Sequence, residues 1–531
     1  MLSAFPSVAM SKSRLATCSK QGIQHGIGKS QKSPWKFEES IMLYKGVPSQ
    51  QSSFHTFSSA VEIELFRKRL LAWYSNCKRD LPWRKLAATE ADVDRRAYAV
   101  WVSEIMLQQT QVASVISYYN RWMQKWPTLQ DLAGASLEEV NELWAGLGYY
   151  SRGKRLQEGA RKIVSEMAGH MPRTAEELQK LLPGVGKYTA GAIASIAFGQ
   201  VTGVVDGNVI RVLCRVRAIG ADPSNSGVTD RFWALSHMLV DPACPGDFNQ
   251  AMMELGATVC TPRVPLCMEC PVRQHCRAHH RVEKELEDSA KRLTERTASK
   301  CSWVLDVEEC GNPAGSCSLC LPPSELWDPS LGVTNFPRKA AKKPPRIEST
   351  ATCVLQRKCH DDKPEYLIVQ RPSTGLLAGL WEFPSFLLSP GQEKQQKATM
   401  ANHIQVWVGS DVTVGHLQHV GEVLHIFSHI RQTYTIYFLN LDKYEGNCKM
   451  EAASAPYKWV TKEEFQTSAV STAMKKVLKA YEKWSSTISV SKVAKRKRDS
   501  LCARKPVLEA ENSSSKKQLS LDSFIVPHPK S

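Results

Sequence analysis

Long apolar runs are missing from this chain. No uninterrupted stretch approaches the roughly 20 apolar residues that a membrane-spanning helix needs. The apolar core of a secretory signal peptide is also missing, so the 16 cysteines are not expected to form the disulfides of a secreted scaffold. Because these cysteines cluster at short spacings, we expect a protein outside the membrane whose thiols bind metal in a reducing compartment.

Acidic residues are absent from positions 1–37, which hold six Lys or Arg and several Ser. This composition is typical of a mitochondrial transit peptide, and equally of a disordered basic arm. Residues 495–498 (Lys-Arg-Lys-Arg) form a compact basic run of the nuclear-import kind, although solvated tails carry such runs too. The sequence therefore predicts both nuclear and mitochondrial destinations.

Positive charge dominates the chain, with a formal net charge of +17 over 531 residues. This balance favours a polyanionic partner, either a nucleic acid or an acidic membrane, unless basic tails merely flank an ordinary enzyme. The hydrophobic content of 42% is enough to build real cores. We expect two or three domains joined by linkers.

Composition changes along the chain divide it into five regions. Amphipathic, helix-forming stretches broken by Gly and Pro turns give way to a charged and Cys-rich connector, then to strand-like segments and a closing helix. The fold class is therefore a mainly α region followed by an α+β domain. The expected regions are a disordered arm (1–61), a helical domain (62–280), a connector (281–345), an α+β domain (346–485) and a disordered tail (486–531).

A glycine-rich turn lies inside the helical region at residues 182–190 (Leu-Pro-Gly-Val-Gly-Lys-Tyr-Thr-Ala). Gly184 and Gly186 permit a tight turn, and a helix is expected to begin at about Lys187. The free amides and the positive end of that helix would face a DNA phosphate. Taken alone, such a turn is weak support for DNA binding.

Four further motifs carry a resemblance to a known family. They lie at residues 80–84 (Asp-Leu-Pro-Trp-Arg), 101–111 (Trp-Val-Ser-Glu-Ile-Met-Leu-Gln-Gln-Thr-Gln), 146–151 (Gly-Leu-Gly-Tyr-Tyr-Ser) and 205–211 (Val-Asp-Gly-Asn-Val-Ile-Arg). With the turn, they resemble the adenine-DNA glycosylases of the MutY type, in the helix-hairpin-helix superfamily. The resemblance implies base excision repair of adenine mispaired with 8-oxoguanine or guanine, in double-stranded DNA.

Two acids would carry the chemistry, because breaking an N-glycosidic bond requires a proton on the leaving base and stabilisation of a cationic sugar. By resemblance, Glu104 is the general acid and Asp206 stabilises or traps the sugar cation. Glu104 lies between Trp101 and Met106, an apolar setting that should raise its pKa.

Relatives that also cut the DNA backbone have a Lys at the position of Tyr188, where its amine forms a Schiff base with the sugar. The adjacent Lys187 should point from a different face of the helix. The sequence therefore predicts a monofunctional glycosylase. By resemblance, Tyr188 and Asn208 would position and hydrogen-bond Asp206 or the sugar.

Base flipping leaves a gap in the duplex that the protein has to fill. By resemblance, the wedge residues that contact the opposite base are Gln109, Thr110, Leu147 and Tyr149. The adenine pocket is expected to be lined by Trp83, Arg84 and Glu254. The alternative is ordinary packing, with Leu147 and Tyr149 in the core and Trp83 at the edge of a domain.

The first cysteine group is Cys260, Cys267, Cys270 and Cys276, with the spacing C-x6-C-x2-C-x5-C. Spacing alone leaves zinc and an iron–sulfur cluster open. The resemblance implies a 4Fe-4S cluster in a loop over 260–276, structural or redox-sensing and not the seat of hydrolysis. Phosphate contacts are expected from Arg263, Arg273 and Arg277.

The second cysteine group, in the connector, is Cys310, Cys317 and Cys320. Three thiolates can hold zinc with a fourth ligand from elsewhere, for which Cys301 and His55 are candidates. Mammalian members of the family imply such a site. The alternative is three cysteines without metal in a flexible linker.

Residues 346–485 resemble the Nudix-like domain of these glycosylases, including the segment 379–384 (Gly-Leu-Trp-Glu-Phe-Pro). The run of glutamates that holds Mg²⁺ in a Nudix hydrolase does not follow Glu382. The sequence therefore predicts recognition without hydrolysis. By resemblance, Phe427, Ser428 and His429 read 8-oxoguanine, with Ser428 hydrogen-bonded to the damaged base.

The tail contains a segment, residues 518–525, that resembles the peptide docking on the replication sliding clamp. One helical turn would direct its apolar side chains at a single groove. Its defining residues are Gln518, Leu521, Phe524 and Ile525. We also expect other repair proteins to bind the connector, and the chain to be a monomer.

Two alternative functions remain open. A glycosylase-lyase for oxidised pyrimidines predicts a Lys at position 188 and no C-terminal domain. A non-enzymatic DNA-binding protein would not require Glu104 and Asp206 together.

Overall fold

A computed structural model describes the chain from residue 53 to residue 502, with gaps. The described residues are 53–294, 310, 317–322, 324–325, 327–339, 344–358, 363–389, 391, 395–408, 412–427, 429–442 and 455–502. Within these ranges, no helix is long and apolar enough to cross a membrane. Most of the expected arm, Cys301, Ser428 and the expected clamp peptide lie outside the described residues.

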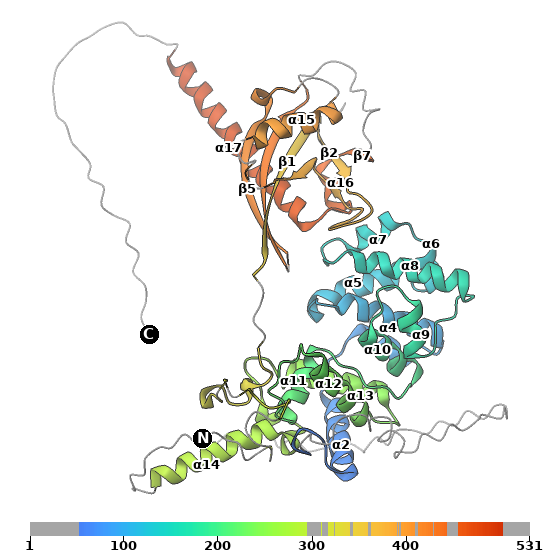
Figure 1. Ribbon diagram of the computed structural model, residues 1–531. Coiled ribbons are helices and arrows are strands. Elements are labelled where there is room, and N and C mark those ends of the chain that lie inside the picture. Colours follow the sequence, from blue (N-terminus) through green and yellow to red (C-terminus); the bar gives the residue numbers. More distant parts are fainter. Residues whose placement is uncertain are drawn as a thin grey trace, which may run out of the picture. The chain divides into compact units, whose positions relative to one another are not determined.

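Helices make up the first part of the structure (Figure 1). Three short ones begin with capping boxes, in which the side chain of Thr128, Ser136 or Thr174 accepts from a backbone N–H three residues on and an acidic side chain reciprocates. The α-helices are α2 (Ala60–Cys77), α3 (Pro82–Thr89), α4 (Val93–Leu107), α5 (Val112–Lys125), α6 (Leu129–Gly134), α7 (Leu137–Trp144), α8 (Ser151–Glu166), α9 (Ala175–Leu181), α10 (Lys187–Phe198), α11 (Gly207–Val216), α12 (Ser226–Leu239), α13 (Pro245–Thr258) and α14 (Arg277–Thr294). The 3-10 helices are η1 (Ser53–His55), η2 (Cys267–Glu269), η3 (Arg273–His275) and η4 (Pro329–Asn335).

These helices pack around two hydrophobic cores. The first includes Trp101 of α4, Trp122 of α5 and Trp144 of α7, with Trp122 in edge-to-face contact with Trp144 at 5.5 Å between ring centroids. The second is built from α2, α11, α12 and α13, and includes Phe66 and Phe232. Because α10 contacts both α4 and α13, it joins the two cores.

Three expected boundaries differ from the structure. The tail was expected to be disordered from residue 486, but the closing helix of the chain continues to Cys502. Phe57 is buried in the second core and its ring lies 5.4 Å from that of Phe66, so packed structure includes residues that were expected to belong to the arm (1–61). In the connector, Leu319, Val333 and Phe336 are also buried in the second core. Part of the expected linker is therefore packed structure, because its apolar side chains have a core to enter.

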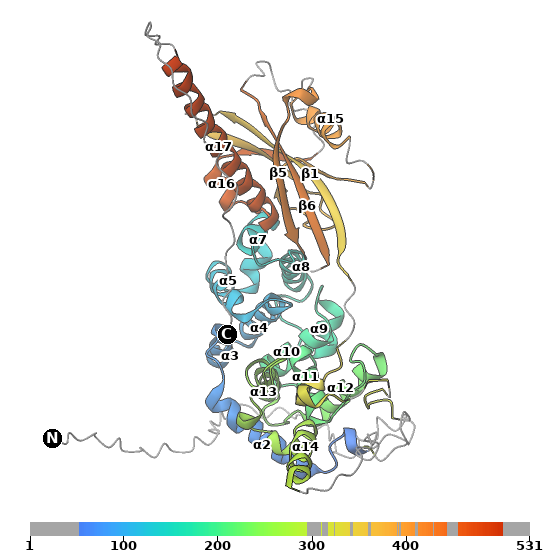
Figure 2. The same cartoon turned by 90° about the vertical axis from the view of Figure 1, so that its left-hand side faces the viewer.

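The second part of the structure is a mixed sheet with helices on both faces (Figure 2). The strand order is β3-β2-β1-β6-β5, with β4 paired to β1 and β7 to β2, and only β1 and β6 are parallel. The strands are β1 (Arg346–Lys358), β2 (Pro364–Gln370), β3 (Trp381–Glu382), β4 (Ser385–Leu387), β5 (Gln418–Ile426), β6 (Ile430–Asn440) and β7 (Tyr457–Val460). The helices are α15 (Gln396–Val408), η5 (Val414–His416), α16 (Lys462–Thr467) and α17 (Thr472–Cys502).

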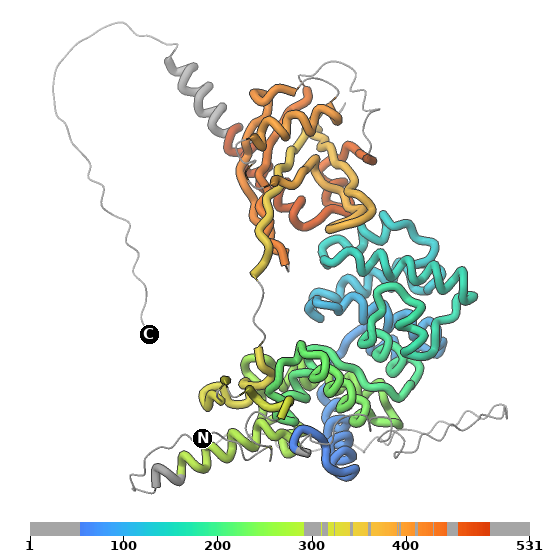
Figure 3. Tube along the Cα trace, viewed as in Figure 1, coloured from blue at the N-terminus to red at the C-terminus, as the bar shows by residue number. Residues whose placement is uncertain are grey.

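Alternation along β1 explains why both faces are covered. Cys353 and Leu355 pack with Ile404 of α15, whereas Val354, between them, belongs to the core that contains Val477 of α17. Figure 3 follows the chain from the helices in blue and green to the sheet in yellow and orange. The expected fold class, a helical region followed by an α+β domain, is confirmed.

Candidate active site

Asp206 lies at the N-cap of α11. Its carboxylate accepts hydrogen bonds from the Val209 N–H at 2.7 Å and from Asn208 Nδ2 at 2.7 Å. Burial raises the pKa of Asp206 above its usual value, while these two donors favour the carboxylate. The positive end of the helix also favours negative charge. The arrangement fixes one carboxyl group in a single orientation.

Glu104 is buried on α4, with 6% of its surface exposed. Burial raises its pKa to about 7, although a hydrogen bond from the Tyr188 hydroxyl, 2.8 Å from Oε2, opposes the shift. A substantial fraction of Glu104 therefore carries a proton at neutral pH. The expected rise in pKa is confirmed.

Both acids line one cavity of about 560 Å³. This volume falls within the range of small-molecule sites, so an extruded nucleoside has room to enter. Tyr188 and Asn208 line the same cavity. The two residues have different partners: the hydroxyl of Tyr188 donates to Glu104 and contacts Met253 Sδ at 3.1 Å, whereas the side-chain bond to Asp206 comes from Asn208.

Glu254 is held by two guanidinium groups at one end of this cavity. Its Oε1 accepts from Arg79 Nε at 2.7 Å, and its Oε2 accepts from Arg84 Nη2 at 2.9 Å. Burial opposes ionisation, but the hydrogen bonds from Arg79 and Arg84 outweigh it and lower the pKa of Glu254 to about 2. Arg79 was not expected at this site, because its only signal in the sequence is its place directly before the motif at 80–84.

Trp83 lies beside this ion-pair group and lines the cavity. Its ring is in edge-to-face contact with Tyr119, 5.5 Å between centroids, and it is 7% exposed. The structure thus brings Trp83, Arg84 and Glu254 to one cavity, together with both candidate catalytic acids.

Two loops next to the cavity have unusual backbone conformations. Gln109 and Tyr149 have positive φ angles of 53° and 48°, which L-residues adopt at some cost. Gln109 and Thr110 line the cavity, and Tyr149 is 42% exposed. Leu147 differs from the expectation: it is 7% exposed and belongs to the first core, so its side chain supports the loop instead of projecting from it.

The glycine turn has the expected form. Gly184 has a φ of +77°, and a Cβ there would lie 2.7 Å from Cδ of Arg155, so glycine is required. Helix α10 begins at Lys187, and its N-cap, Gly186, has no side chain to satisfy the first amides. Lys187 Nζ lies over the ring of Trp233, 4.1 Å from its centroid. It does not line the cavity.

The cysteines of the first group surround a second, smaller cavity. In the described part of the chain, the ligand atoms that lie within 4.8 Å of one another belong to the second cysteine group and not to this one. The four thiols are therefore more widely spread than the ligands of one ion. Arg215 Nη1 lies 3.3 Å from Cys260 Sγ. Four thiols, with a nearby guanidinium that offsets thiolate charge, could hold a metal centre. The thiols belong to Cys260, Cys267, Cys270 and Cys276.

Arg211, which the sequence analysis did not single out, connects this loop to the aspartate. Its Nε donates to the Cys260 carbonyl at 2.7 Å, and its Nη2 donates to Asn208 Oδ1 at 2.8 Å. Since Asn208 donates to Asp206, a hydrogen-bonded path joins the cysteine loop to the candidate catalytic carboxylate.

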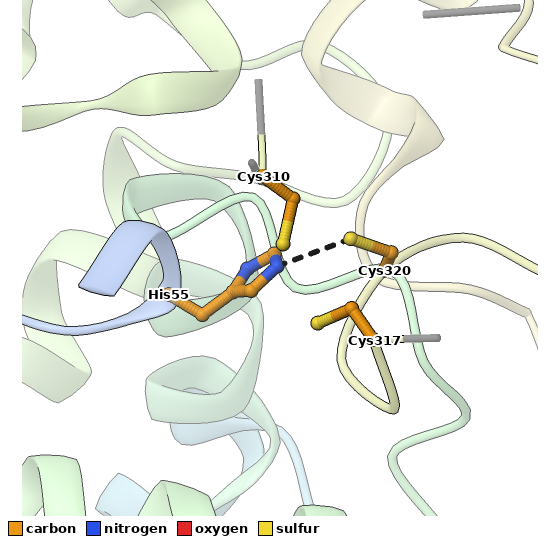
Figure 4. Close-up of side chains that lie close together, drawn as sticks. All are labelled: His55, Cys310, Cys317 and Cys320. Carbon is orange, nitrogen blue, oxygen red and sulfur yellow. Dashed lines mark hydrogen bonds between the residues drawn. The ribbon is translucent and has the colours of Figure 1, made fainter. Parts of the chain in front are cut away.

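The second cysteine group forms a compact site with His55, as Figure 4 shows. Its ligand atoms all lie within 4.8 Å of one another, a spacing that suits one tetrahedral ion. The Arg217 carbonyl lies 2.9 Å from His55 Nδ1, which leaves Nε2 facing Cys320 Sγ at 3.2 Å. Burial lowers the pKa of His55 to about 4, so the imidazole is neutral, as a ligand must be. The site consists of His55, Cys310, Cys317 and Cys320.

In the sheet part, Glu382 forms an ion pair with Arg371, 2.6 Å between Oε2 and Nη1. A carboxylate engaged in this way is not a free magnesium ligand. Phe427 and His429 lie at the turn between β5 and β6, where the Phe427 N–H donates to the Ile430 carbonyl at 2.8 Å. Ser428 lies between them, outside the described residues.

Both parts of the chain match known protein families. Residues 102–237 match the HhH-GPD superfamily of base excision DNA repair proteins, and residues 353–480 match the NUDIX domain. The adenine DNA glycosylase of Homo sapiens is 62% identical over 431 residues, which cover 81% of this chain and 76% of that protein. The adenine DNA glycosylase of Rattus norvegicus is 60% identical over 431 residues, which cover 81% of this chain and 80% of that protein.

Among solved structures, a thermostable thymine-DNA glycosylase is similar to this chain, with 27% sequence identity and a TM-score of 0.37. The match covers 42% of this chain and 98% of that chain. The C-terminal domain of mouse MUTYH, solved with human PCNA, is 45% identical over 26% of this chain and 89% of that chain, with a TM-score of 0.22. The identity to the curated enzymes over 81% of the chain, together with the HhH-GPD match, shows the family. The chain belongs to the adenine DNA glycosylases, enzymes of base excision repair that hydrolyse N-glycosyl bonds.

Proposed function

We propose that this glycosylase removes adenine mispaired with 8-oxoguanine or guanine, after flipping the adenosine out of double-stranded DNA. The observation that carries the proposal is that Glu104 and Asp206 line one cavity large enough for a nucleoside. One acid has a pKa near neutrality and the other is held by donors that favour its anion, the pair of states that glycoside hydrolysis requires.

In the proposed reaction, the Glu104 carboxyl donates its proton to the adenine ring as the N-glycosidic bond breaks. The bonding electrons leave with the base, and positive charge develops on the sugar. The Asp206 carboxylate stabilises that cation until water adds to C1′ and loses a proton. Tyr188 orients Glu104, and Asn208 orients Asp206.

The reaction stops at the abasic site in this proposal. Tyr188 occupies the position at which lyases have a Schiff-base lysine, and the neighbouring Lys187 lies against Trp233. Among the residues that the structure describes, no lysine lines the cavity. Strand cleavage would therefore require a separate nucleophile.

The adenine pocket would consist of Trp83, Arg84 and Glu254, with Arg79 as a further member. The buried Glu254 carboxylate can accept from the exocyclic amine of adenine, while the two guanidinium groups keep it ionised. Gln109, Thr110 and Tyr149 would fill the gap in the duplex, and Leu147 would support them from the core. The amides after Gly184 and Gly186 would bind a phosphate.

A single-turnover assay tests the chemistry, on duplex DNA with adenine opposite 8-oxoguanine. We expect Glu104→Gln to lose at least about 100-fold in rate, because the amide has no proton to donate. Glu166→Gln, at a side chain that is 61% exposed at the end of α8, is the matched control and should keep the wild-type rate. Equal rates for the two variants would refute the role of Glu104.

Recognition of 8-oxoguanine is proposed for Phe427, Ser428 and His429, in the Nudix-like part of the chain. The ratio of excision rates with 8-oxoguanine and with guanine opposite the adenine measures it. Ser428→Ala should lower this ratio while leaving the rate opposite guanine unchanged. An unchanged ratio would contradict the proposal.

We propose a 4Fe-4S cluster on Cys260, Cys267, Cys270 and Cys276, and a zinc ion on the second group. The cluster, when bound, would organise the loop that carries Arg263 and Arg273, and the start of α14 at Arg277, toward DNA phosphates. Zinc would fasten His55 to the connector. Iron and zinc analysis of the purified protein, with its visible absorption spectrum, tests both assignments. Zinc at both sites and no iron would overturn the first.

Docking on the sliding clamp is proposed for the segment that contains Gln518, Leu521, Phe524 and Ile525. A pull-down with the clamp, comparing the full chain with the Phe524→Ala variant, tests it; equal binding would contradict it. We further propose nuclear and mitochondrial locations, a monomeric state and repair partners for the connector. We also propose the five regions given above, with the helical region extended to begin near residue 53 and the α+β domain extended through α17 to Cys502.

A further inference from the structure

One buried arginine lies behind the two loops proposed to enter DNA, residues 108–110 and 146–149. Arg152 is near the start of α8 and is 6% exposed. Gln109 and Tyr149 of the proposed wedge both have positive φ angles, a conformation that costs free energy for L-residues. The loops therefore need contacts that hold this conformation. The contacts of Arg152 explain how this backbone is held.

One side of the guanidinium binds the end of α4. Nη1 donates to the carbonyls of Ile105 at 3.0 Å, Met106 at 2.9 Å and Gln108 at 2.6 Å. The last carbonyls of a helix have no partner within the helix, so an external donor stabilises them. These contacts fix the point at which the first loop leaves the helix that carries Glu104.

The other side of the same group binds the loops themselves. Nη2 donates to the Gly148 carbonyl at 2.9 Å and to Thr110 Oγ1 at 3.2 Å. Nε lies 3.4 Å from the Tyr149 carbonyl. One planar group therefore touches both loops and the helix end, although no covalent link joins the three.

The chemistry of these contacts requires arginine. The guanidinium lies over the rings of Trp144 and Tyr149, 5.4 and 5.3 Å from their centroids. Among the described residues, no carboxylate forms an ion pair with it, so its charge is balanced by carbonyl oxygens and aromatic faces. Lysine has three donors on one atom and cannot reach partners on opposite sides.

We propose that Arg152 is a positioning residue that fastens both DNA-entering loops to the end of α4, so that Gln109 and Tyr149 are held in the inserted conformation before DNA binds. The inference rests on the proposed wedge. Holding the loops in advance removes an ordering cost from base extrusion, and leaves the chemistry at Glu104 unchanged.

The test compares two full-length variants on two DNA duplexes. Arg152→Lys removes the planar fork but keeps the charge. Arg161→Lys is the matched control, since Arg161 also lies on α8 and donates to the carbonyls of Ala133 at 3.1 Å and Ala135 at 2.8 Å, far from the wedge loops in sequence. One duplex has adenine opposite 8-oxoguanine, and the other has adenine opposite an abasic site, where extrusion is easier.

We expect Arg152→Lys to slow single-turnover excision about 10- to 100-fold on the paired duplex, and less than about 3-fold on the duplex with the abasic site. The fluorescence rise of 2-aminopurine beside the adenine, which reports unstacking, should slow in parallel. The pH profile should not move. Arg161→Lys should match the wild type in all three measurements.

Equal slowing on both duplexes, a shifted pH profile, or an effect of Arg161→Lys as large as that of Arg152→Lys would overturn the inference. If Arg152→Lys does not fold, Thr110→Val replaces it in the test. Thr110→Val has to slow excision more on the paired duplex than on the duplex with the abasic site, although by a smaller factor than expected for Arg152→Lys. Equal slowing on the two duplexes would also overturn the inference. If the wild type excises adenine from neither duplex, the proposed function itself is refuted.

Discussion

Three carboxyl groups around one cavity differ in ionisation because their neighbours differ. Glu104 accepts a hydrogen bond from a neutral hydroxyl, and the charge of Arg84 opposes burial only as a minor influence, so burial dominates and its pKa rises to about 7. Glu254 is also buried, but two guanidinium groups lower its pKa to about 2. Burial raises the pKa of Asp206 as well, while two hydrogen-bond donors favour its anion. Side-chain partners thus decide which acid can donate a proton.

A bell-shaped pH dependence of the single-turnover rate follows from these ionisations. Glu104 has to be protonated, so the rate should fall as pH rises through about 7. Asp206 has to be ionised, and since its pKa is raised, the acid limb should lie above the usual range of aspartate. Rates measured in buffers of constant ionic strength check both limbs. A rate that stays flat from pH 6 to 9 would contradict the assignment of Glu104.

Removing the charge of Glu254 should destabilise the protein. In Glu254→Gln the guanidinium groups of Arg79 and Arg84 lose their shared anion, and breaking a buried ion pair costs about 3 kcal/mol. Denaturant unfolding of the helical part measures the change. The control is Glu158→Gln, which breaks an exposed pair with Lys154 and should cost less than about 0.5 kcal/mol. Equal stabilities of Glu254→Gln and the wild type would show that these ion pairs do not stabilise the fold.

At the scale of elements, α11 connects features that are far apart in the sequence. Asp206 caps its first turn, and Arg211 on its exposed face donates to the Cys260 carbonyl. At its last turns, Arg215 contacts Cys260 Sγ, and the Arg217 carbonyl binds His55. A shift of this helix would therefore move the proposed catalytic carboxylate and both cysteine groups together.

The observed role of Asp206 as a helix cap and its proposed role as a catalytic carboxylate can be separated by substitution. Asparagine caps a helix about as well as aspartate, so Asp206→Asn should keep the stability of the wild type but lose at least about 100-fold in excision rate. Asp206→Ala should lose the same activity and about 1 kcal/mol of stability as well. Thermal unfolding and single-turnover kinetics measure both. High activity in Asp206→Asn would refute the catalytic role.

At the scale of the whole molecule, segments distant in sequence meet at the second cysteine group. His55 lies 265 residues before Cys320, and Phe57 beside it packs under the Arg217 guanidinium, 3.4 Å from ring centroid to Cζ. A metal bound there would hold the N-terminal segment and the connector on the second core.

Loss of His55 should therefore lower the metal content of the protein. We expect His55→Ala to lose about one equivalent of zinc while keeping its iron, and to unfold at lower temperature, because a ligand bound only to the folded state stabilises it. Metal analysis and calorimetry measure the two effects. His170→Ala removes a histidine that is 74% exposed and should change neither value. Unchanged zinc in His55→Ala would show that His55 is not a ligand.

By itself, the sequence determined the order of a helical region and an α+β domain, the family motifs, and the presence of Tyr188 where a lyase has lysine. Such features are local or depend on spacing, so they can be identified without coordinates. Only the tertiary structure decided that Tyr188 bonds to Glu104, that Arg79 shares Glu254, that Leu147 is buried and that His55 completes the second cysteine group. The reason is physical: each of these depends on contacts between residues far apart in the chain, and packing alone determines which side chains meet.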